Sequence, residues 1–408
     1  MTHTYIYDAL RTPRGKGTAP REGKAGGALA SVPPQHLVSQ LVDALAERHG
    51  EDALVNVARL LLGCVGQVGS QGGHLALVSR IASNLPETVV PKTLNNYCVS
   101  GMTAVIEAAL RSQAGDAGLS LAGGVEMLSQ VPFQADKASY YADPATSAQL
   151  NWVAPIMGAE LIATEEGFTK ADLDRLTLRS HQRAAAAWEA GKYGASVIPV
   201  RDRDGATLLA HDELVRPGLS AEQLESMPPA FAELGQAGQD QRVLDHRPHL
   251  SAIDHVHSIA NCPGMADGAA LVLTGSAEAG ESAGLRPRAR VLAVAETAGD
   301  PVLQFGAGFA AMERALESAG LELAQLDRIE FMEAFAAVPL RFESRFDVYP
   351  ERVNVSGGHL AMGHPMGATG AILLCTLLNE LEQSDTSLGM AVALAGGGLG
   401  TAMIIERV

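Results

Sequence analysis

A cysteine at position 98 stands where a nucleophile could be activated. Residues 88–94 before it are strand-like, and the small residues Ser100 and Gly101 after it open an apolar helical segment. We therefore expect Cys98 at or near a helix N-terminus, where unpaired backbone N–H groups and the helix dipole favour a thiolate. A nucleophilic role and a buried structural role both fit this pattern, since free cysteines are often core residues.

A glycine-rich segment at 357–370 carries two histidines, His359 and His364. So many glycines are costly in chain entropy for an ordinary helix or strand, which indicates a functional loop. Pro365 biases the backbone of His364 to an extended conformation, which suits an imidazole that points into a cleft. His364 is therefore a candidate base for activating a thiol. Alternatively, both histidines only satisfy hydrogen bonds within the loop.

A second glycine cluster, at 396–400, follows a strand-like run near the C-terminus. It lacks the G-x-G-x-x-G spacing, the following helix and the acidic residue of a dinucleotide-binding loop, so NAD is not an expected ligand. A glycine after a strand can instead present its backbone N–H to a reacting carbonyl oxygen. Gly396 is the candidate for this oxyanion contact.

These three segments occur in an order that resembles the thiolase family of acyl-CoA C-acyltransferases. The nucleophile motif is N-x-x-C-x-S-G at 95–101, and the histidine motif is G-H-P-x-G-A-T-G at 363–370. Further matching segments lie at 11–16, 122–126, 179–187, 216–218, 267–270 and 333–336, and at the terminal glycine turn. The pattern is most similar to the degradative branch of the family.

The resemblance implies a division of roles within the site. Cys98 would take the acyl group from a CoA thioester, His364 would accept the thiol proton, and the N–H groups of Cys98 and Gly396 would hold the oxyanion. Coenzyme A would be a substrate or product, with no permanently bound cofactor and no metal. The positions that match the pantetheine tunnel are Met157, Arg216, Phe231, Ala334 and Phe335. The resemblance also implies homodimers or homotetramers.

Two positions depart from the family pattern. Leu394 stands two residues before Gly396, where the family has its second catalytic cysteine. Met332 replaces an asparagine or histidine that positions water in the other oxyanion hole. Leucine cannot transfer a proton, and methionine is only a weak hydrogen-bond acceptor. We therefore expect thiolysis and Claisen condensation to be impaired or altered.

Three functions are compatible with these residues. The leading one is an acyltransferase that passes the acyl group from Cys98 to CoA or another acceptor. The second is a CoA-thioester hydrolase, or a transferase to a non-carbon nucleophile. The third is a non-catalytic subunit that pairs with a second, active enzyme. A nearby residue could also replace the missing acid/base, and the candidates are Cys262, His257 and Glu333.

Strand-like and helical runs alternate in two sets, which predicts an α/β fold with sheets buried on both faces. Similar runs into paired glycines, at 119–126 and 392–397, indicate an internal duplication. The thiolase resemblance implies two duplicated halves in a layered α-β-α-β-α arrangement with an inserted loop domain. We expect an N-terminal half at 1–128 that is completed by about 250–285, a loop domain over the CoA site at 129–249, and a C-terminal half at 286–408.

Composition excludes several classes of protein. The chain has 408 residues, a net charge of −16 and no basic run able to neutralise phosphates, so nucleic acid is not an expected partner. Its four cysteines are far apart, which argues against a disulfide framework or a zinc site and fits a reducing cytoplasm. The uncharged segment 387–405 contains the glycine cluster, so two buried strands are expected there rather than a membrane span.

Overall fold

Two similar half-sheets form the frame of the molecule. The computed structural model describes residues 3–408. The strands of the N-terminal half are β1 (Thr4–Arg11), β3 (Val57–Gly63), β4 (Val90–Leu94), β5 (Leu119–Met127) and β8 (Ala266–Ser276). Those of the C-terminal half are β9 (Ala289–Ala298), β10 (Arg328–Phe331), β11 (Leu388–Ala395) and β12 (Leu399–Arg407). The spatial order is β4-β3-β5-β8-β1 in the first half and β10-β11-β12-β9 in the second.

The two halves share one topology. The pairs β3–β5 and β10–β11 are parallel, and the following pairs in each half-sheet are antiparallel. β5 and β11 therefore occupy equivalent places, in agreement with the duplication indicated by their glycine-paired sequences. A short antiparallel pairing of residues 4–6 with 289–291 joins the half-sheets. With β2 (Gly15–Lys16) on β8, the sheet has ten strands within residues 3–408.

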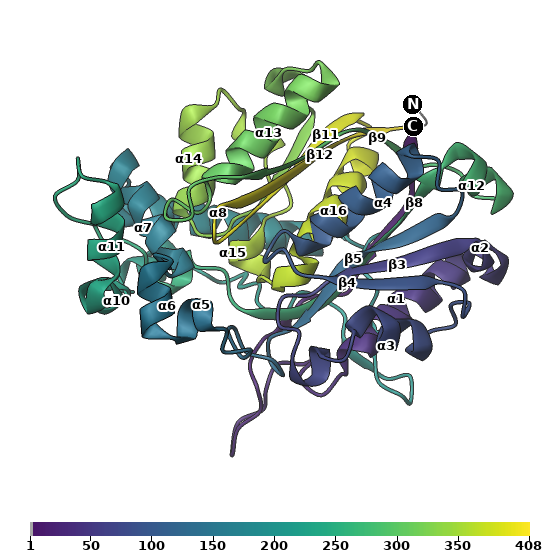
Figure 1. The fold of residues 1–408 in the computed structure, drawn as a ribbon, viewed down its shortest axis with the longest axis horizontal. Helices are drawn as coiled ribbons and strands as arrows, with labels where there is room; N and C mark the ends of the chain where they lie inside the picture. The colour runs from purple at the N-terminus through teal and green to yellow at the C-terminus, as the bar shows by residue number, and fades with distance from the viewer. Residues whose placement is uncertain (1–2) are drawn as a thin grey trace.

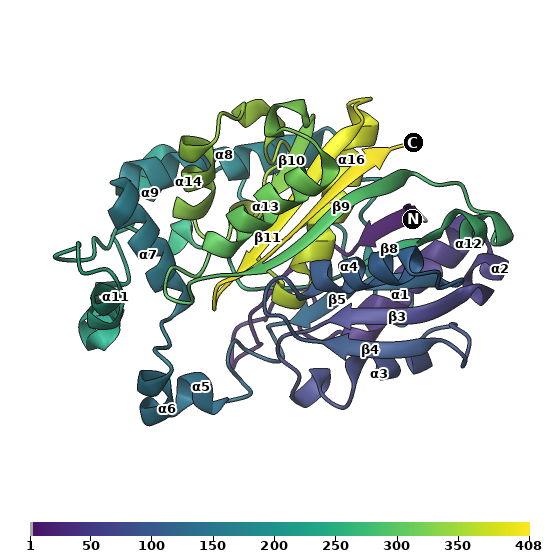
Figure 2. The same ribbon diagram turned by 45° about the horizontal axis from the view of Figure 1, so that its top comes forward.

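Helices separate and cover the half-sheets in five layers (Figure 1 and Figure 2). α4 (Ser100–Gln113) and α16 (Thr369–Gln383) pack against each other between the half-sheets. α1 (Pro34–His49) and α3 (Leu75–Ala82) cover the outer face of the N-terminal half, and α13 (Gly306–Ala319) covers the C-terminal half. The predicted layered α/β fold is confirmed.

Burial explains why the central elements are apolar on every side. β5 and β8 are buried at every residue, and α16 is buried continuously from Thr369 to Leu381. A strand with both faces covered reads as a continuous apolar run, and a helix enclosed by two sheets lacks a polar face. A charged residue in these elements therefore has to find partners inside the protein.

Residues 129–249 form mostly short helices beside the sheets (Figure 1). They are α5 (Ser139–Ala142), α6 (Pro144–Gln149), α7 (Pro155–Glu166), α8 (Lys170–Glu189), α9 (Ala221–Glu225), α10 (Ala232–Leu234) and α11 (Asp240–His246), with the small hairpin β6 (Val200–Arg201) and β7 (Thr207–Leu209). α8 begins with a capping box between Thr169 and Asp172. This reciprocal pair satisfies two backbone donors that a helix start otherwise leaves free.

The uncharged segment near the C-terminus forms an antiparallel hairpin. β11 and β12 pair along their whole length around a glycine turn, as the sequence predicts. Gly397 and Gly398 have φ angles of 77° and 76° in that turn, a region that glycine enters without strain. Among residues 3–408, none of the helices combines the length and apolarity needed to cross a membrane.

A buried carboxylate stabilises the junction of the two halves. Asp8 on β1 is 2% exposed and accepts hydrogen bonds from Arg48 and Arg288, while His49 Nε2 lies 2.8 Å from its Oδ2. Burial alone would raise the pKa of Asp8, but His49 and the two arginines hold it below its ordinary value. Arg288 also donates to Glu382 of α16, with Nη2 2.6 Å from Oε2. One arginine therefore connects a strand of the first half to the central helix of the second.

We predict that Asp8→Asn lowers the free energy of unfolding by on the order of 2 kcal/mol at pH 7, because it removes charged hydrogen bonds from partly buried arginines. A depressed carboxyl pKa stabilises the fold above the unfolded-state value of about 4, and this contribution is lost as pH falls through the folded-state pKa. The difference between wild type and variant should therefore shrink at acid pH. Urea unfolding at pH 7 and pH 3.5 measures it, and an equal difference at both values would contradict the prediction.

Candidate active site

Cys98 lies in a tight turn between β4 and α4. Ser100 Oγ donates to the carbonyl oxygen of Tyr97 at 2.6 Å and accepts from the N–H of Asn96 at 2.7 Å. Tyr97 has a φ of 48°, an uncommon value for a residue with a side chain. The serine that follows the cysteine by two residues thus fixes the turn and places Cys98 directly before α4, as predicted.

The thiol of Cys98 is neutral in the ligand-free protein. Burial, and next the negative charge of Glu126, raise its pKa to about 12. Desolvation therefore opposes the thiolate that the helix N-terminus is predicted to favour. Cys98 therefore needs a base at the moment of reaction.

His364 has the properties of such a base. Its Nδ1 lies 2.7 Å from Thr369 Oγ1, and its backbone N–H donates to Gly264 O at 2.8 Å. Burial, and next the charge of Arg14, lower its pKa to about 3. The imidazole is therefore neutral at physiological pH. With Nδ1 engaged by Thr369, Nε2 is the ring nitrogen left to accept a proton.

One carboxylate fastens the histidine loop to the nucleophile half. Glu126 Oε2 accepts the N–H groups of Val65 and Gly367, each at 2.9 Å. Its Oε1 accepts from the N–H of Gly66 at 3.0 Å and from Gln71 Nε2 at 2.8 Å. Gly367 follows His364 by three residues, so this four-way contact, the Glu126 clamp, sets the position of the base relative to β3 and β5.

Glycines allow the two motifs to meet backbone to backbone. A Cβ on Gly101 of α4 would lie 2.7 Å from the carbonyl oxygen of Gly367, and a Cβ on Gly124 of β5 would collide with the same oxygen. A Cβ on Gly367 itself would lie 2.9 Å from Glu126 Oε2. These glycines of the sequence motifs are thus needed because a side chain at any of them would prevent the close backbone contact between the segments.

Cys98 and Gly396 line the same pocket, as predicted from the separate motifs. Met366, two residues after His364, is part of the same wall. Much of the remaining wall is aromatic, with Tyr97, Phe133, Tyr140, Tyr141 and Trp152. Gly396 directly follows β11 of the C-terminal half, so the pocket is lined by residues of both halves and of the 129–249 region.

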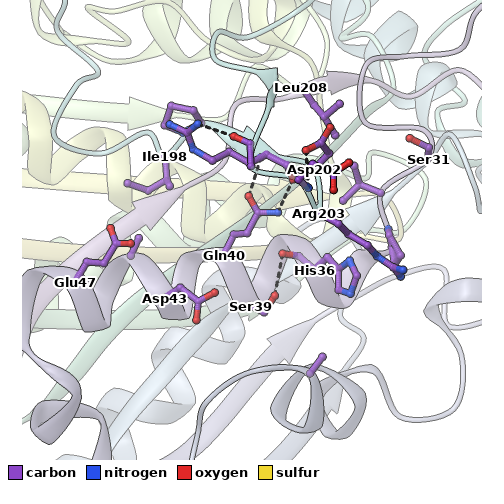
Figure 3. A pocket seen from close by; sticks show the side chains of 18 residues that line it. Ser31, His36, Ser39, Gln40, Asp43, Glu47, Ile198, Asp202, Arg203 and Leu208 are labelled. Atoms are coloured by element: carbon purple, nitrogen blue, oxygen red, sulfur yellow. Dashed lines mark hydrogen bonds between the residues drawn. The ribbon is translucent and has the colours of Figure 1, made fainter.

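A wider pocket elsewhere lacks these groups. It lies between α1 and the β6–β7 hairpin, where Gln40 and the backbone of Arg201 exchange two hydrogen bonds of 3.1 and 2.8 Å (Figure 3). α1 covers the outer face of the N-terminal half-sheet, whereas Cys98 precedes α4 on the inner face. Neither the cysteine nor the glycine turn contributes to this pocket, so the chemistry is placed in the aromatic one.

Leu394 and Met332 are core residues in the structure. They are 0% and 1% exposed, and both belong to the hydrophobic cluster between the halves. Leu394 packs over α13, where a Cβ on Gly308 would lie 2.5 Å from Leu394 Cδ2. Both side chains are thus accommodated by tight apolar packing, and neither offers a proton.

The three residues considered as substitutes are engaged elsewhere. Glu333 accepts from Ser180 Oγ at 2.7 Å, Leu360 N at 3.0 Å and Asn354 Nδ2 at 3.3 Å. His257 Nδ1 lies 2.7 Å from Glu160, and Cys262 Sγ lies 3.6 Å from the carbonyl oxygen of Ser258. Burial, and next Glu160, raise the pKa of Cys262. None of the three lines the pocket beside Cys98.

The positions matched to the pantetheine tunnel are not part of the wall of this pocket. Phe335 makes ring contacts with His257 and Phe305, with centroids 6.2 and 5.7 Å apart. Met157 and Ala334 are buried, Phe231 is half-buried and Arg216 is exposed. None of the five lines the Cys98 pocket.

Two supporting residues were not identified as functional from the sequence. One is Glu126, and the other is Arg14, whose Nη1 donates to Gly363 O, directly before His364, at 2.8 Å. The sequence could have indicated the role of Glu126, because a single carboxylate in the fully buried strand β5 must have hydrogen-bond partners inside the protein. The sequence could not indicate the partner of Arg14, because that partner lies 349 residues away in the chain.

We predict that Glu126→Gln lowers the free energy of unfolding by about 3 kcal/mol. Each carboxylate oxygen accepts two N–H donors, so either orientation of the glutamine amide places its NH2 group against two donors. Glu107→Gln is the matched control, because Glu107 pairs with partly exposed Lys92 and Arg111, and it should change stability by less than about 1 kcal/mol. Equal changes in the free energy of unfolding for the two substitutions would contradict the stabilising role of the Glu126 clamp.

We also predict that alkylation of Cys98 by iodoacetamide accelerates about tenfold per pH unit from pH 7 to 10, because the thiolate is the reactive form of a thiol whose pKa lies near 12. Peptide mass spectrometry separates Cys98 from the other three cysteines. A plateau below pH 9 would indicate a stabilised thiolate instead.

Comparisons with known proteins show the family and the fold of the chain. The thiolase N-terminal domain family matches residues 5–240, and the thiolase C-terminal domain family matches residues 285–407. The chain is 34% identical to β-ketoadipyl-CoA thiolase of Pseudomonas aeruginosa, over 99% of both chains, and 32% identical to 3-ketoacyl-CoA thiolase of Erwinia tasmaniensis, over 100% of both. The crystal structure of Bacillus anthracis acetyl-CoA acetyltransferase superposes with a TM-score of 0.83 at 29% identity, covering 100% of this chain and 99% of that one. The chain belongs to the thiolase family of acyl-CoA acyltransferases.

Proposed function

We infer that the protein transfers acyl groups through a thioester on Cys98. The carrying observation is that Cys98 and Gly396 line one pocket together with Met366, which lies two residues after His364. The imidazole of His364 is neutral at physiological pH, so a ring nitrogen is available to accept the thiol proton when substrate arrives.

The acylation half of the reaction balances with these groups alone. His364 Nε2 takes the Sγ proton, and the thiolate attacks the carbonyl carbon of an acyl-CoA thioester. The negative charge on the carbonyl oxygen is held by the N–H groups of Cys98 and Gly396. The bond to the CoA sulfur then breaks, and His364 returns the proton to the departing thiolate. The products are an acyl-Cys98 thioester and free CoA.

The second half of the reaction is the one that Leu394 and Met332 alter. Carbon–carbon bond making or breaking needs a group that moves the proton at the Cα atom of the acyl chain, and both buried side chains lack a titratable atom. We propose that thiolysis and condensation are impaired, and that the acyl group passes to a non-carbon acceptor, because its return to CoA would only regenerate the starting thioester. Hydrolysis of the acyl-enzyme is the second candidate, because water needs no Cα proton transfer.

The CoA moiety is proposed to lie along Met157, Arg216, Phe231, Ala334 and Phe335. Arg216 is the exposed cation of this set, which suits an anionic part of CoA at the rim, while the apolar members suit the pantetheine arm. The β-ketoadipyl-CoA and 3-ketoacyl-CoA thiolases among the relatives indicate 3-oxoacyl thioesters as the first substrates to test. A homodimer or homotetramer in the cytoplasm is the proposed working form.

We predict that incubation with acyl-CoA produces a mass adduct on Cys98 and releases one equivalent of CoA. Cys98→Ala should abolish the adduct, and His364→Ala should slow its formation by 10²–10⁴-fold because the base is lost. Absence of an adduct across several chain lengths would reject the acyl-enzyme and favour a non-catalytic subunit.

We further predict that the double variant Leu394→Cys and Met332→Asn gains acetoacetyl-CoA thiolysis from a baseline near zero. The parent and the variant are assayed in parallel for thiolysis and for release of free acid. A robust thiolysis rate in the parent would show that the two apolar residues leave carbon–carbon chemistry intact. Acid release without added CoA would favour the hydrolase.

A further inference from the structure

One glutamine in the wall of the Cys98 pocket has a side-chain carbonyl oxygen that accepts no hydrogen bond. Gln304 is 1% exposed, and its Nε2 donates to the carbonyl oxygens of Val153 at 3.0 Å and Ala154 at 3.2 Å. Both partners are acceptors, so they determine which end of the amide is the NH2 group. The carbonyl end, Oε1, therefore points away from them.

The Oε1 atom of Gln304 is buried without a hydrogen-bond donor among the described residues 3–408. It lies beside the glycine turn, because a Cβ on Gly396 would be 3.0 Å from it. Gln304, Gly396 and Cys98 line the same pocket. Buried polar atoms are nearly always paired, so an unpaired acceptor at this place indicates a missing donor.

The surrounding loop is built to hold Gln304 in this position. Its φ angle is 59°, in the left-handed region that residues with a side chain rarely adopt. Asp300 supports the turn, since its carbonyl oxygen accepts the N–H of Gln304 at 2.9 Å and its Oδ1 accepts the N–H of Val302 at 2.8 Å. Arg247 in turn binds Asp300 Oδ2 at 2.6 Å. A strained backbone angle that is held in place by several surrounding hydrogen bonds is typical of functional positions.

A donor group on a ligand in this pocket would satisfy Gln304 Oε1. Gly396 is the proposed N–H donor to the thioester oxygen, so negative charge develops close to Oε1 during acylation. An acceptor beside an oxyanion is unfavourable unless a donor lies between or next to them. Much of the remaining wall consists of Tyr97, Phe133, Tyr140, Tyr141 and Trp152, whose rings suit an apolar or cyclic group.

We propose that Gln304 is a specificity-determining residue that accepts a hydrogen bond from a hydroxyl group on the acyl chain of the substrate. The preferred substrate is then a CoA thioester with a hydroxyl close to its carbonyl and a bulky apolar or aromatic remainder. This inference rests on the proposed function only in taking the pocket beside Cys98 as the acyl site. An acyl group without the hydroxyl leaves Oε1 buried and unpaired, and a site of this kind discriminates against it.

The test compares two thioesters that differ by one hydroxyl, 3-hydroxy-3-phenylpropanoyl-CoA and 3-phenylpropanoyl-CoA. Binding is measured by calorimetry in the Cys98→Ala protein, which cannot form the acyl-enzyme. We expect the hydroxylated thioester to bind about tenfold more tightly, the ratio that one hydrogen bond gives. When Gln304→Met is added to the Cys98→Ala protein, this affinity ratio should fall to about one, because only the binding of the hydroxylated thioester becomes weaker.

Gln40→Met is the matched control. Gln40 also makes two hydrogen bonds with backbone groups, but it lies in the outer pocket beside α1 (Figure 3). It should leave the tenfold ratio unchanged. If the Gln304→Met variant does not fold, the ratio of affinities for the two thioesters in the Cys98→Ala protein alone decides whether the proposal stands. Equal affinity for the two thioesters, or no affinity for either, overturns the proposal.

Acylation of Cys98 is followed separately by mass spectrometry in proteins that retain the cysteine. A preserved binding ratio without any Cys98 adduct would reject the acyl-enzyme and leave the role of Gln304 standing. If Gln304→Met instead slows release of both acyl groups equally and leaves the binding ratio unchanged, the residue positions the attacking water. That result would overturn the substrate role proposed for it.

Discussion

The Glu126 clamp is the contact on which the active-site geometry depends. A single carboxylate receives N–H donors from the end of β3 and from the loop that carries His364. Those segments come from opposite halves of a duplicated fold, and the glycines at 101, 124 and 367 allow their backbones to come close enough for one side chain to reach both. The four N–H hydrogen bonds offset the free-energy cost of desolvating the Glu126 carboxylate only if all of them are formed. The contact therefore favours one arrangement of the segments that carry Cys98 and His364.

The same buried setting determines the protonation states of the catalytic pair. Desolvation raises the pKa of the Cys98 thiol and lowers that of His364, so neither group carries charge before substrate binds. A pre-formed ion pair would be harder to maintain in this environment. In the proposed mechanism the developing charge is met by backbone N–H groups, which need no reorganisation during the reaction.

The two apolar residues at positions 394 and 332 belong to the core behind the pocket-forming segments rather than to the pocket wall. Leu394 fills the space over Gly308 on α13, and Met332 joins the core between the halves. Beside Gly396, Gln304 brings an acceptor to the pocket wall that the motifs did not indicate. The pocket thus brings the candidate nucleophile Cys98, the candidate oxyanion donor Gly396 and the Gln304 amide together in one wall.

The sequence by itself determined the layered α/β fold, most element positions and the candidate groups Cys98, His364 and Gly396, because motif spacing and apolar periodicity are local properties of the chain. Tertiary structure decided what those groups experience. Desolvation raises the pKa of Cys98 and so opposes the local helix dipole that the sequence reveals. Arg14 and Gln304 acquire their roles from partners about 150 to 350 residues away. Contacts across that separation depend on how the two halves pack, which no spacing within one segment encodes.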